Sequence, residues 1–254
     1  MPSDRSLRGG GRFRISVTGE PALAVKTGPA DAIGREVSAL ARLAGTGLAP
    51  DLVRHTLDTV AMTFVDGPVR RLSTLTPADA RTLGGRIRSI HELDRATTGG
   101  RHVWARPVAS LDDYARARQE DLEPVPDDLR PLATAAADRL RPVVADGVEA
   151  PFRFLHGDLV AANILWTPVP VLVDWEFWRT GDPAEDLAYL AVMNGLPDAV
   201  MDAVLAGYGD SAMHARTEAW RAACALDAGL WYRRSGDRDG ADRLIAVARA
   251  SLDR

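Results

Sequence analysis

The side chains best suited to chemistry are Asp158, Asn163 and Asp174, the last of which comes eleven residues after Asn163. If the apolar residues between Asn163 and Asp174 form a hairpin around a loop at 167–170, the register pairs Asn163 with Asp174. Cross-strand partners have Cβ atoms about 4.5–5.5 Å apart, so an amide oxygen and a carboxylate placed there could share a hard cation. The competing interpretation is a polar turn before an apolar hairpin, with Asp158 as a cap.

The run from His156 to Asn163 reads His-Gly-Asp-Leu-Val-Ala-Ala-Asn. Together with Asp174, it resembles the catalytic loop and metal-binding aspartate of the aminoglycoside phosphotransferase and choline kinase family, which has a protein-kinase-like fold. The resemblance implies that Asp158 accepts the proton of a substrate hydroxyl. It also implies that Asn163 and Asp174 hold Mg²⁺ against the phosphates of ATP or GTP.

The segment after Asp174 follows the same family pattern, with the forms Asp-Trp-Glu and Gly-Asp-Pro-x-x-Asp-Leu-Ala. By resemblance, Asp186 braces the catalytic loop through its backbone and is structural, as is His156. Asp182, which precedes Pro183, is predicted to be the N-cap of the next helix. Because only seven residues separate Asp174 from Asp182, no peptide-docking activation loop fits, and a protein substrate is disfavoured.

Nearer the N-terminus, Lys26 ends a predicted strand and Glu36 lies one turn into the following predicted helix. The two residues resemble the kinase Lys–Glu pair that orients nucleotide phosphates, and a buried lysine needs such a partner. Two unrelated surface residues are the alternative. The same resemblance makes Met62–Gly67 the hinge, where backbone groups around Thr63 and Val65 would bind the base of the nucleotide.

A glycine run at residues 9–11 is the candidate for a loop that covers the phosphates. The chain departs from the family here, because it contains neither a GxGxxG nor a GxxxxGK pattern. A flexible tail is the alternative interpretation of these glycines.

Acidic residues outnumber basic residues between His156 and Asp186. The resulting negative charge would attract a cationic substrate. Glu176 is left over once metal binding, capping and bracing are assigned, so it is the candidate for binding an amine. Farther along, Trp220, Asp227 and Trp231 fall on one face of a predicted helix and could hold an ammonium group by charge and cation–π attraction. A packed core with one paired aspartate is the alternative.

The elements that position these residues can be predicted from apolar spacing. Alternation predicts strands at 13–17, 23–25 and 60–64, and helical spacing predicts a helix from Asp31 to Gly45. This order indicates a small nucleotide-binding lobe at residues 1–66.

The remaining residues, 67–254, are predicted to form a larger, mostly helical catalytic and substrate-binding lobe. Thr76 and Pro77 are the predicted N-cap and first residue of its first helix. The expected fold is therefore α+β and bilobal, with a small N-terminal antiparallel sheet plus a helix and a larger helical C-terminal lobe.

Composition narrows the choice of function. The net charge of −4 over 254 residues argues against a nucleic-acid binder. Cys224 is the only cysteine, and the histidines show no zinc-binding spacing, so neither a disulfide nor a zinc site is expected. No apolar run reaches the roughly 18 residues of a membrane span, and we expect a cytoplasmic protein with no membrane partner.

Taken together, these features predict a small-molecule kinase that phosphorylates a hydroxyl of an amine-bearing substrate, such as an aminoglycoside or another antibiotic. Two alternatives stay open: a choline or amino-alcohol kinase, and a kinase-like protein that binds a nucleotide without turnover. The sequence does not indicate the oligomeric state.

Overall fold

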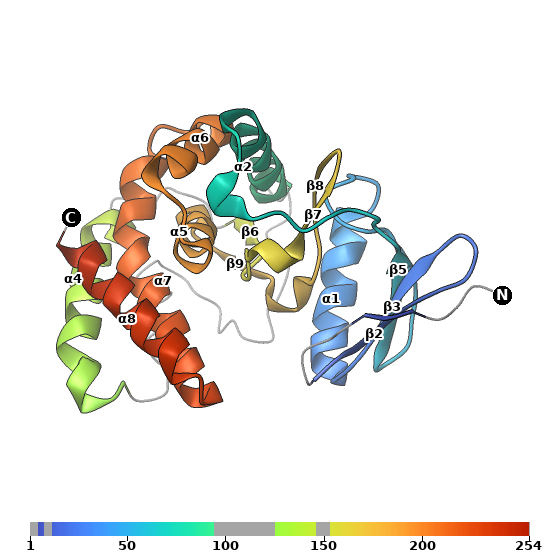
Figure 1. Ribbon diagram of the computed structural model, residues 1–254, viewed down its shortest axis with the longest axis horizontal. Helices are drawn as coiled ribbons and strands as arrows, with labels where there is room; N and C mark the ends of the chain where they lie inside the picture. The colour runs from blue at the N-terminus through green and yellow to red at the C-terminus, as the bar shows by residue number, and fades with distance from the viewer. Residues whose placement is uncertain (1–4, 8–11, 94–124, 146–152, 254) are drawn as a thin grey trace.

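The computed structural model describes residues 5–7, 12–93, 125–145 and 153–253, so the glycine run at 9–11 lies outside the described residues. A small sheet with one helix lies at one end of the long axis, and a group of helices fills the other end (Figure 1). The predicted α+β architecture, with a small antiparallel sheet and a mostly helical remainder, is confirmed.

The sheet is antiparallel throughout, with the strand order β1-β2-β3-β5-β4. Its strands are β1 Arg5–Leu7, β2 Arg14–Thr18, β3 Leu23–Thr27, β4 Leu52–His55 and β5 Thr59–Thr63. β2, β3 and β5 correspond to the predicted strands, whereas β1 and β4 were not predicted. β4 is an edge strand with a register shift between Leu52 and Arg54, so it lacks the regular alternation that marks a strand in sequence.

Helix α1, Ala30–Leu43, packs against β4 and β5. Its apolar residues Ile33, Leu40 and Leu43 recur at helical spacing and are buried, as expected for an amphipathic helix. Glu36 lies among these buried positions, where a charged group requires a partner. Gly45, with φ of 72°, lies just beyond the helix in the left-handed conformation common after helix ends.

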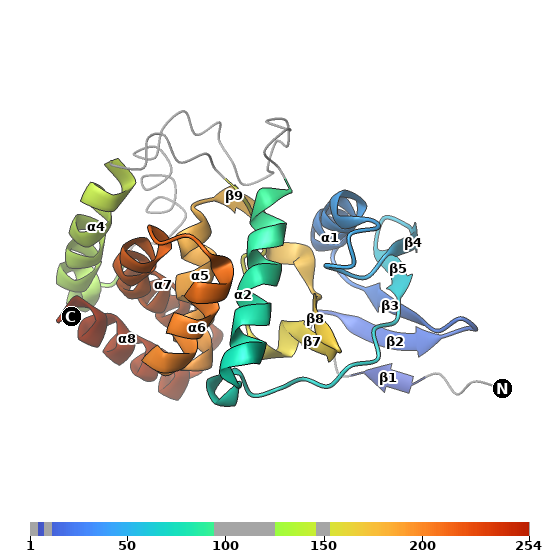
Figure 2. The ribbon, with the colours of Figure 1, turned by 90° about the horizontal axis from the view of Figure 1, so that it is seen from above.

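Helix α2, Pro77–Glu92, is the first long helix after the sheet and follows the short 3-10 turn η1, Leu72–Thr74. As predicted, Thr76 is the N-cap, because its side chain accepts a hydrogen bond from the Asp79 N–H, and Pro77 occupies the first turn. α2 runs alongside α6, Asp198–Tyr208 (Figure 2).

Glycines let α2 and α6 approach each other closely. A Cβ added at Gly84 would lie 1.9 Å from the Val204 carbonyl oxygen, and one added at Gly207 would lie 2.0 Å from the Arg81 carbonyl oxygen. Both positions therefore exclude any side chain unless the helices move apart.

In the described part of the chain, the other α-helices are α4 Arg130–Ala145, α5 Pro183–Asn194, α7 Met213–Ser235 and α8 Arg238–Leu252. α7 is packed against α4, α5 and α8, so it buries side chains around much of its circumference (Figure 1). Within the described residues, no helix combines the length and apolar character needed to cross a bilayer.

Two short antiparallel ribbons carry the segments of chemical interest. β6 Arg153–Leu155 pairs with β9 Arg179–Gly181, and β7 Ile164–Thr167 pairs with β8 Val169–Leu172. The β7–β8 ribbon lies between the sheet and the helices (Figure 1). A bridge between Val69 and Leu165 ties the ribbon to the segment that leaves the sheet.

The turn of the β7–β8 ribbon is shorter than predicted. The ladder continues to the pair Thr167 and Val169, so only Pro168 lies between the strands, and not the predicted loop at 167–170. This shorter turn shifts every cross-strand pair by one residue.

The predicted pairing of Asn163 with Asp174 is therefore wrong. Asn163 lies opposite Val173, whose N–H donates a hydrogen bond to the Asn163 carbonyl oxygen at 3.0 Å. Asp174 comes one residue later, where the chain leaves the ribbon.

The contact between α2 and α6 predicts a sharp difference between neighbouring glycines. Gly84→Ala should destabilise the protein by about 1–3 kcal/mol, because the new methyl group overpacks a backbone contact. Gly85→Ala, on the same helix, places its Cβ no nearer than 3.7 Å to another atom and should be neutral or stabilising by up to about 1 kcal/mol. Urea unfolding midpoints of the two variants test this, and equal midpoints would contradict the packing argument.

Candidate active site

Asp158 lies in the loop that follows β6, and donors hold both oxygens of its carboxylate. Asn163 Nδ2 donates to Asp158 Oδ2 at 2.9 Å and to the Asp158 carbonyl oxygen at 3.0 Å. The Tyr189 hydroxyl donates to Asp158 Oδ1 at 3.1 Å. Burial raises the pKa of Asp158 above its ordinary value. A carboxylate with a raised pKa and a fixed orientation is suited to accept a proton from a bound hydroxyl.

Gly157 gives this loop its shape. Its φ is 83°, and a Cβ added there would lie 2.2 Å from the Phe177 carbonyl oxygen. Only glycine meets both conditions without strain. The loop therefore approaches the segment after β8 closely, which brings Asp158 toward that segment.

Asp174 follows β8 in a left-handed backbone conformation, with φ of 67° and ψ of 65°, which is uncommon for a residue other than glycine. Its Oδ1 accepts a hydrogen bond from Lys26 Nζ at 2.5 Å. Its charge contributes to the raised pKa of Asp158, so the two carboxylates lie close enough to interact. Asp158, Asn163 and Asp174 thus share one region of the protein, although Asn163 and Asp174 are not cross-strand partners.

Lys26 is buried, with 3% of its surface exposed, and its ammonium group lies between two carboxylates. Nζ is 2.6 Å from Glu36 Oε2 and 2.5 Å from Asp174 Oδ1, and it lies 4.2 Å from the centre of the Phe13 ring. Burial alone would lower the pKa of Lys26, but Glu36 and Asp174 together raise it above its ordinary value. The lysine is therefore charged, and it joins β3 to α1 and to the turn after β8.

Glu176 lies in the 3-10 turn η4, Trp175–Phe177, and is buried at 4% exposure. Arg12 Nη2 donates to its Oε1 at 3.3 Å, while its Oε2 has no hydrogen-bond partner among the described residues. Burial raises the pKa of Glu176 to about 7, and the charge of Asp174 adds to this rise. The charges of Lys26, Asp174 and Glu36 all act on Glu176, so it lies beside the lysine site.

The side chains around Asp174 fit a divalent cation such as Mg²⁺. Because Asn163 Nδ2 donates to Asp158, its side-chain oxygen is the atom that remains for a cation, and Asp174 supplies carboxylate oxygen. The unpartnered Oε2 of Glu176 adds a buried carboxylate oxygen nearby. The described residues contain no cluster of three His, Cys, Asp or Glu side chains that could form a closed metal site. Mg²⁺ does not require one, because it takes few protein oxygens together with water and phosphate oxygens.

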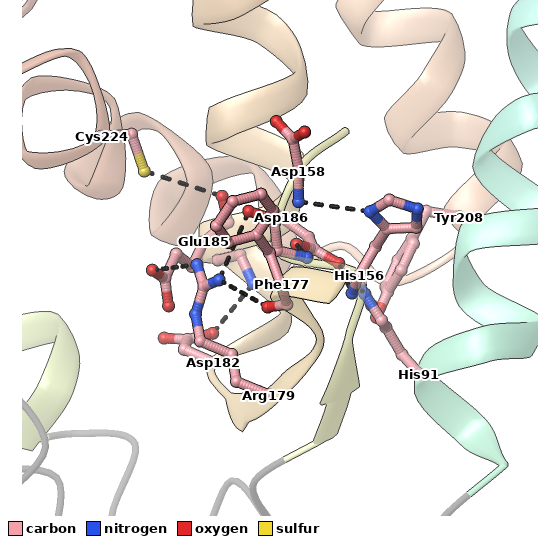
Figure 3. Close-up of polar contacts among 12 residues, drawn as sticks. His91, His156, Asp158, Phe177, Arg179, Asp182, Glu185, Asp186, Tyr208 and Cys224 are labelled. Carbon is pink, nitrogen blue, oxygen red and sulfur yellow. Dashed lines mark hydrogen bonds and ion pairs between the residues drawn. The ribbon is translucent and has the colours of Figure 1, made fainter. Parts of the chain in front are cut away.

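A buried network ties the loop at 156–163 to the helices (Figure 3). Asp186 Oδ2 accepts a hydrogen bond from the His156 N–H at 2.7 Å, and its Oδ1 accepts one from the Gly157 N–H at 2.9 Å. His91 Nε2 lies 3.1 Å from Asp186 Oδ2, and His91 Nδ1 lies 3.0 Å from the Tyr208 hydroxyl. Burial opposes the charge on Asp186, but the hydrogen bond from His91 keeps the pKa of Asp186 below its ordinary value.

Thr63 and Val65, which were predicted to bind the base of a nucleotide, differ in the backbone groups that are available. The Thr63 N–H donates to the Asp51 carbonyl oxygen at 2.9 Å, and the Phe64 N–H donates to the Ala22 carbonyl oxygen at 3.1 Å. These amides are committed to the sheet. Val65 comes after the sheet ends and is the remaining candidate of the pair.

The two tryptophans of the predicted face on α7 differ in burial. Trp220 is 4% exposed, and its indole N–H donates to Asp182 Oδ2 at 2.9 Å, whereas Trp231 is 56% exposed and lies edge-on to Tyr232. The charge of Asp227 reaches Tyr189, whose pKa is raised first by burial and then by the charge of Asp158. Trp220 thus belongs to the packed core.

Asp182 is confirmed as the N-cap of α5, because its Oδ1 accepts a hydrogen bond from the Ala184 N–H at 3.0 Å. Its other oxygen accepts from Arg216 and Trp220 on α7. One carboxylate therefore caps α5 and fastens it to α7.

Two polar residues near Asp158 were not identified from the sequence. Tyr189 contacts the Asp158 carboxylate, and the Asn194 side chain contacts the backbone of Leu159 and Ala161. Both follow Asp186 on α5, three and eight residues later. Their spacing gives no signal, because Tyr189 and Asn194 lie about 140° apart around the helix axis.

Comparison with known sequences identifies a family and one curated relative. Residues 12–224 match the sequence model of the phosphotransferase enzyme family. Viomycin phosphotransferase of Streptomyces vinaceus is 37% identical over 93 residues, which cover 34% of this chain and 32% of the relative. The chain therefore aligns with only about a third of that relative's length.

Comparison with solved structures identifies the fold. A choline/ethanolamine kinase family protein from Mesorhizobium loti has a TM-score of 0.75 at 20% identity, covering 99% of this chain and 88% of that one. A thermostable aminoglycoside phosphotransferase in ternary complex with AMP-PNP and hygromycin B has a TM-score of 0.73 at 15% identity, covering 99% and 94%. These similarities confirm the kinase-like fold that was inferred from the sequence.

His156 should make stability depend on pH, because burial lowers its pKa below the ordinary value of 6.5. As the pH falls through about 6.5, the unfolded chain binds the proton before the folded protein does, so the stability contributed by neutral His156 is lost. In His156→Gln, the loss of unfolding free energy between pH 7.5 and 5.5 should be smaller than in the wild type by about 1 kcal/mol.

Denaturant unfolding at the two pH values measures this difference. The exposed His214 provides the control, and His214→Gln should retain the wild-type dependence on pH. An unchanged dependence in His156→Gln would show that His156 is not held neutral.

Proposed function

The chain belongs to the phosphotransferase enzyme family, and on that premise we propose that it transfers the terminal phosphate of ATP or GTP to a hydroxyl group of a small, amine-bearing molecule. The observation that carries the proposal is the position of Asp158. Its carboxylate is held by Asn163 and Tyr189, within electrostatic range of Asp174, which pairs with the buried Lys26. A fixed proton acceptor beside a cationic phosphate site is the arrangement that phosphoryl transfer to a hydroxyl requires.

In the proposed mechanism, Asp158 orients the acceptor hydroxyl toward the terminal phosphate and takes its proton as the new O–P bond forms. The bond between the β- and γ-phosphates breaks at the same time, and the nucleoside diphosphate leaves with that electron pair. Lys26, held by Glu36, binds the nucleotide phosphates through its ammonium group. Mg²⁺, when held by Asn163 and Asp174, would neutralise the charge on the phosphates. His156 and Asp186 keep the loop in place. Catalysis by this chain is then mainly a matter of position and charge.

The same proposal divides the chain into a nucleotide-binding lobe, residues 1–66, and a catalytic and substrate-binding lobe, residues 67–254. Support comes from the origin of the site residues, because Lys26 and Glu36 lie on β3 and α1, whereas Asp158 follows β6. Val65, at the end of the sheet, would contact the base of the nucleotide.

The proposed acceptor is an antibiotic, such as an aminoglycoside or a peptide antibiotic. Support comes from the curated relative, which is named a viomycin phosphotransferase, and from the structural relative with bound hygromycin B. Two further carboxylates would favour a cationic molecule, namely Glu176, beside Lys26 and Asp174, and Asp227, whose charge reaches Tyr189. Such a reaction would belong in the cytoplasm, where nucleoside triphosphates are available, and would protect the host from the antibiotic.

A choline or amino-alcohol kinase is the second candidate. It is favoured by the similarity to the choline/ethanolamine kinase family protein. The burial of Trp220 in the core counts against it, because an aromatic cage is the usual receptor for a quaternary ammonium group and its rings must face the ligand.

The decisive experiment follows labelled phosphate from ATP and GTP onto viomycin, hygromycin B, other aminoglycosides, choline and ethanolamine. The wild type should label at least one of these compounds. Asp158→Asn should lower kcat about a hundredfold to ten-thousandfold, because it removes the proton acceptor and preserves the shape of the side chain. Asp239→Asn, at an exposed position in the first turn of α8, should match the wild type.

The possible outcomes of this assay are distinct. Equal rates in Asp158→Asn and the wild type would remove Asp158 from the mechanism. Nucleotide binding without transfer to any acceptor would favour a silent nucleotide-binding protein.

Metal dependence tests the roles proposed for Asn163 and Asp174. EDTA should abolish transfer, and added Mg²⁺ should restore it. Asp174→Asn should raise the Mg²⁺ concentration for half-maximal rate by about tenfold or more, because few protein oxygens hold the ion. Asp210→Asn, at an exposed position, is the control. Full activity in EDTA, or an unchanged Mg²⁺ requirement in Asp174→Asn, would contradict the assignment.

A further inference from the structure

One side of helix α5 contacts the catalytic loop at several points. Asp186 binds the backbone N–H groups of His156 and Gly157 at the start of the loop. Tyr189 and Asn194 follow on α5 and reach positions farther along the loop. At 3.6 residues per turn, Tyr189 lies about 60° to one side of Asp186 around the helix axis, and Asn194 lies about 80° to the other side. The loop therefore meets polar side chains across a broad face of α5.

Tyr189 contacts the reacting side chain itself. Its hydroxyl donates to Asp158 Oδ1 at 3.1 Å, while Asn163 donates to Oδ2 at 2.9 Å. Burial and the adjacent charge of Asp158 raise the pKa of Tyr189, so the phenol stays protonated and acts as a donor. With one donor on each oxygen, rotation of the carboxylate about its bond to Cβ is restrained.

Asn194 holds the backbone that follows Asp158. Its Nδ2 donates to the Leu159 carbonyl oxygen at 3.0 Å, and its Oδ1 accepts from the Ala161 N–H at 2.8 Å. The same amide nitrogen donates to the Leu190 carbonyl oxygen at 2.7 Å, which anchors the side chain to its own helix. One side chain thus satisfies two backbone groups of the loop, on either side of Val160.

We propose that Tyr189 and Asn194 are positioning residues for phosphoryl transfer, because they hold the Asp158 carboxylate and the loop that carries it in the orientation the reaction needs. This inference rests on the proposed function. Neither residue contacts Lys26, Glu36 or Asp174 in the described interactions, so both act on the transfer step and not on nucleotide binding. Errors of about 1 Å in such positions can cost about a hundredfold in rate.

The first test is Tyr189→Phe, which removes only the hydroxyl. Two reactions of MgATP are followed in parallel. One is transfer of the γ-phosphate to the acceptor that was labelled in the panel above, and the other is its hydrolysis by water. We expect kcat to fall about tenfold to a hundredfold, while KM for MgATP and the melting temperature stay near the wild-type values. Tyr232→Phe, which removes a hydroxyl on α7 away from the loop, should not change kcat. An unchanged kcat in Tyr189→Phe would overturn the proposal for Tyr189.

A double-mutant cycle separates positioning from a general structural effect. If Tyr189 acts through Asp158, then Tyr189→Phe should have no further effect on the residual rate of Asp158→Asn. If the tyrosine only supports the fold, its effect should be the same in both backgrounds. Equal fold-losses in the two backgrounds would overturn the positioning role.

Hydrogen exchange tests the inference without turnover. In Asn194→Ala, the Ala161 amide should exchange faster than in the wild type, while amides of β7 keep their protection. Ser235→Ala, which removes a similar side-chain bond at the end of α7, is the control and should leave the loop unchanged.

Unchanged protection of Ala161 in Asn194→Ala would overturn the role of Asn194 even if the enzyme is active. If the wild type releases no phosphate at all, the proposed function fails, and the exchange result alone decides whether α5 holds the loop.

Discussion

The site depends on one buried ammonium group. Lys26 Nζ is shared by Glu36 and Asp174, which come from α1 and from the turn after β8. Removing one partner of a buried ion pair typically costs about 3–5 kcal/mol, because it leaves an uncompensated charge. The sheet, its helix and the β7–β8 ribbon are therefore constrained to meet at Lys26. This places the charge of Asp174 where it raises the pKa of both Asp158 and Glu176.

Backbone conformation at two turns is the second constraint. Gly157 and Asp174 both have positive φ, at 83° and 67°. Glycine takes this conformation freely, whereas an aspartate there costs about 1–2 kcal/mol. The ion pair with Lys26 offsets that cost, since it holds Asp174 Oδ1 at 2.5 Å from Nζ. The residue with the strained backbone, Asp174, therefore also has a charged partner for its side chain. Backbone strain of this kind is common at functional sites.

Local patterns predicted the parts of the fold that are governed by neighbouring residues. The N-caps Thr76 and Asp182 were correct, because capping involves residues only two or three places apart. The β7–β8 register was wrong because it depends on the number of residues in the turn, which apolar alternation does not reveal. The different burial of Trp220 and Trp231 could not be predicted, since spacing along α7 does not tell how far along its length other elements cover one side. Tyr189 and Asn194 were missed because the polar groups they contact come from a distant part of the chain, which only the folded structure brings close.

The position of Asp158 on a loop raises the question of how a short irregular segment can be precise. A glycine at Gly157 lets the loop turn sharply but gives it no rigidity of its own. Precision must therefore come from α5, whose N-terminus is fixed by Asp182 and whose Asp186 is bonded to His91 on α2. Helices position side chains more precisely than loops do. A loop that is hydrogen-bonded to a buried helix is therefore held in a more precise position. Under the proposed function, side chains on α5 therefore position the loop in two ways. Asp186 and Asn194 hold its backbone, and Tyr189 holds the Asp158 carboxylate itself.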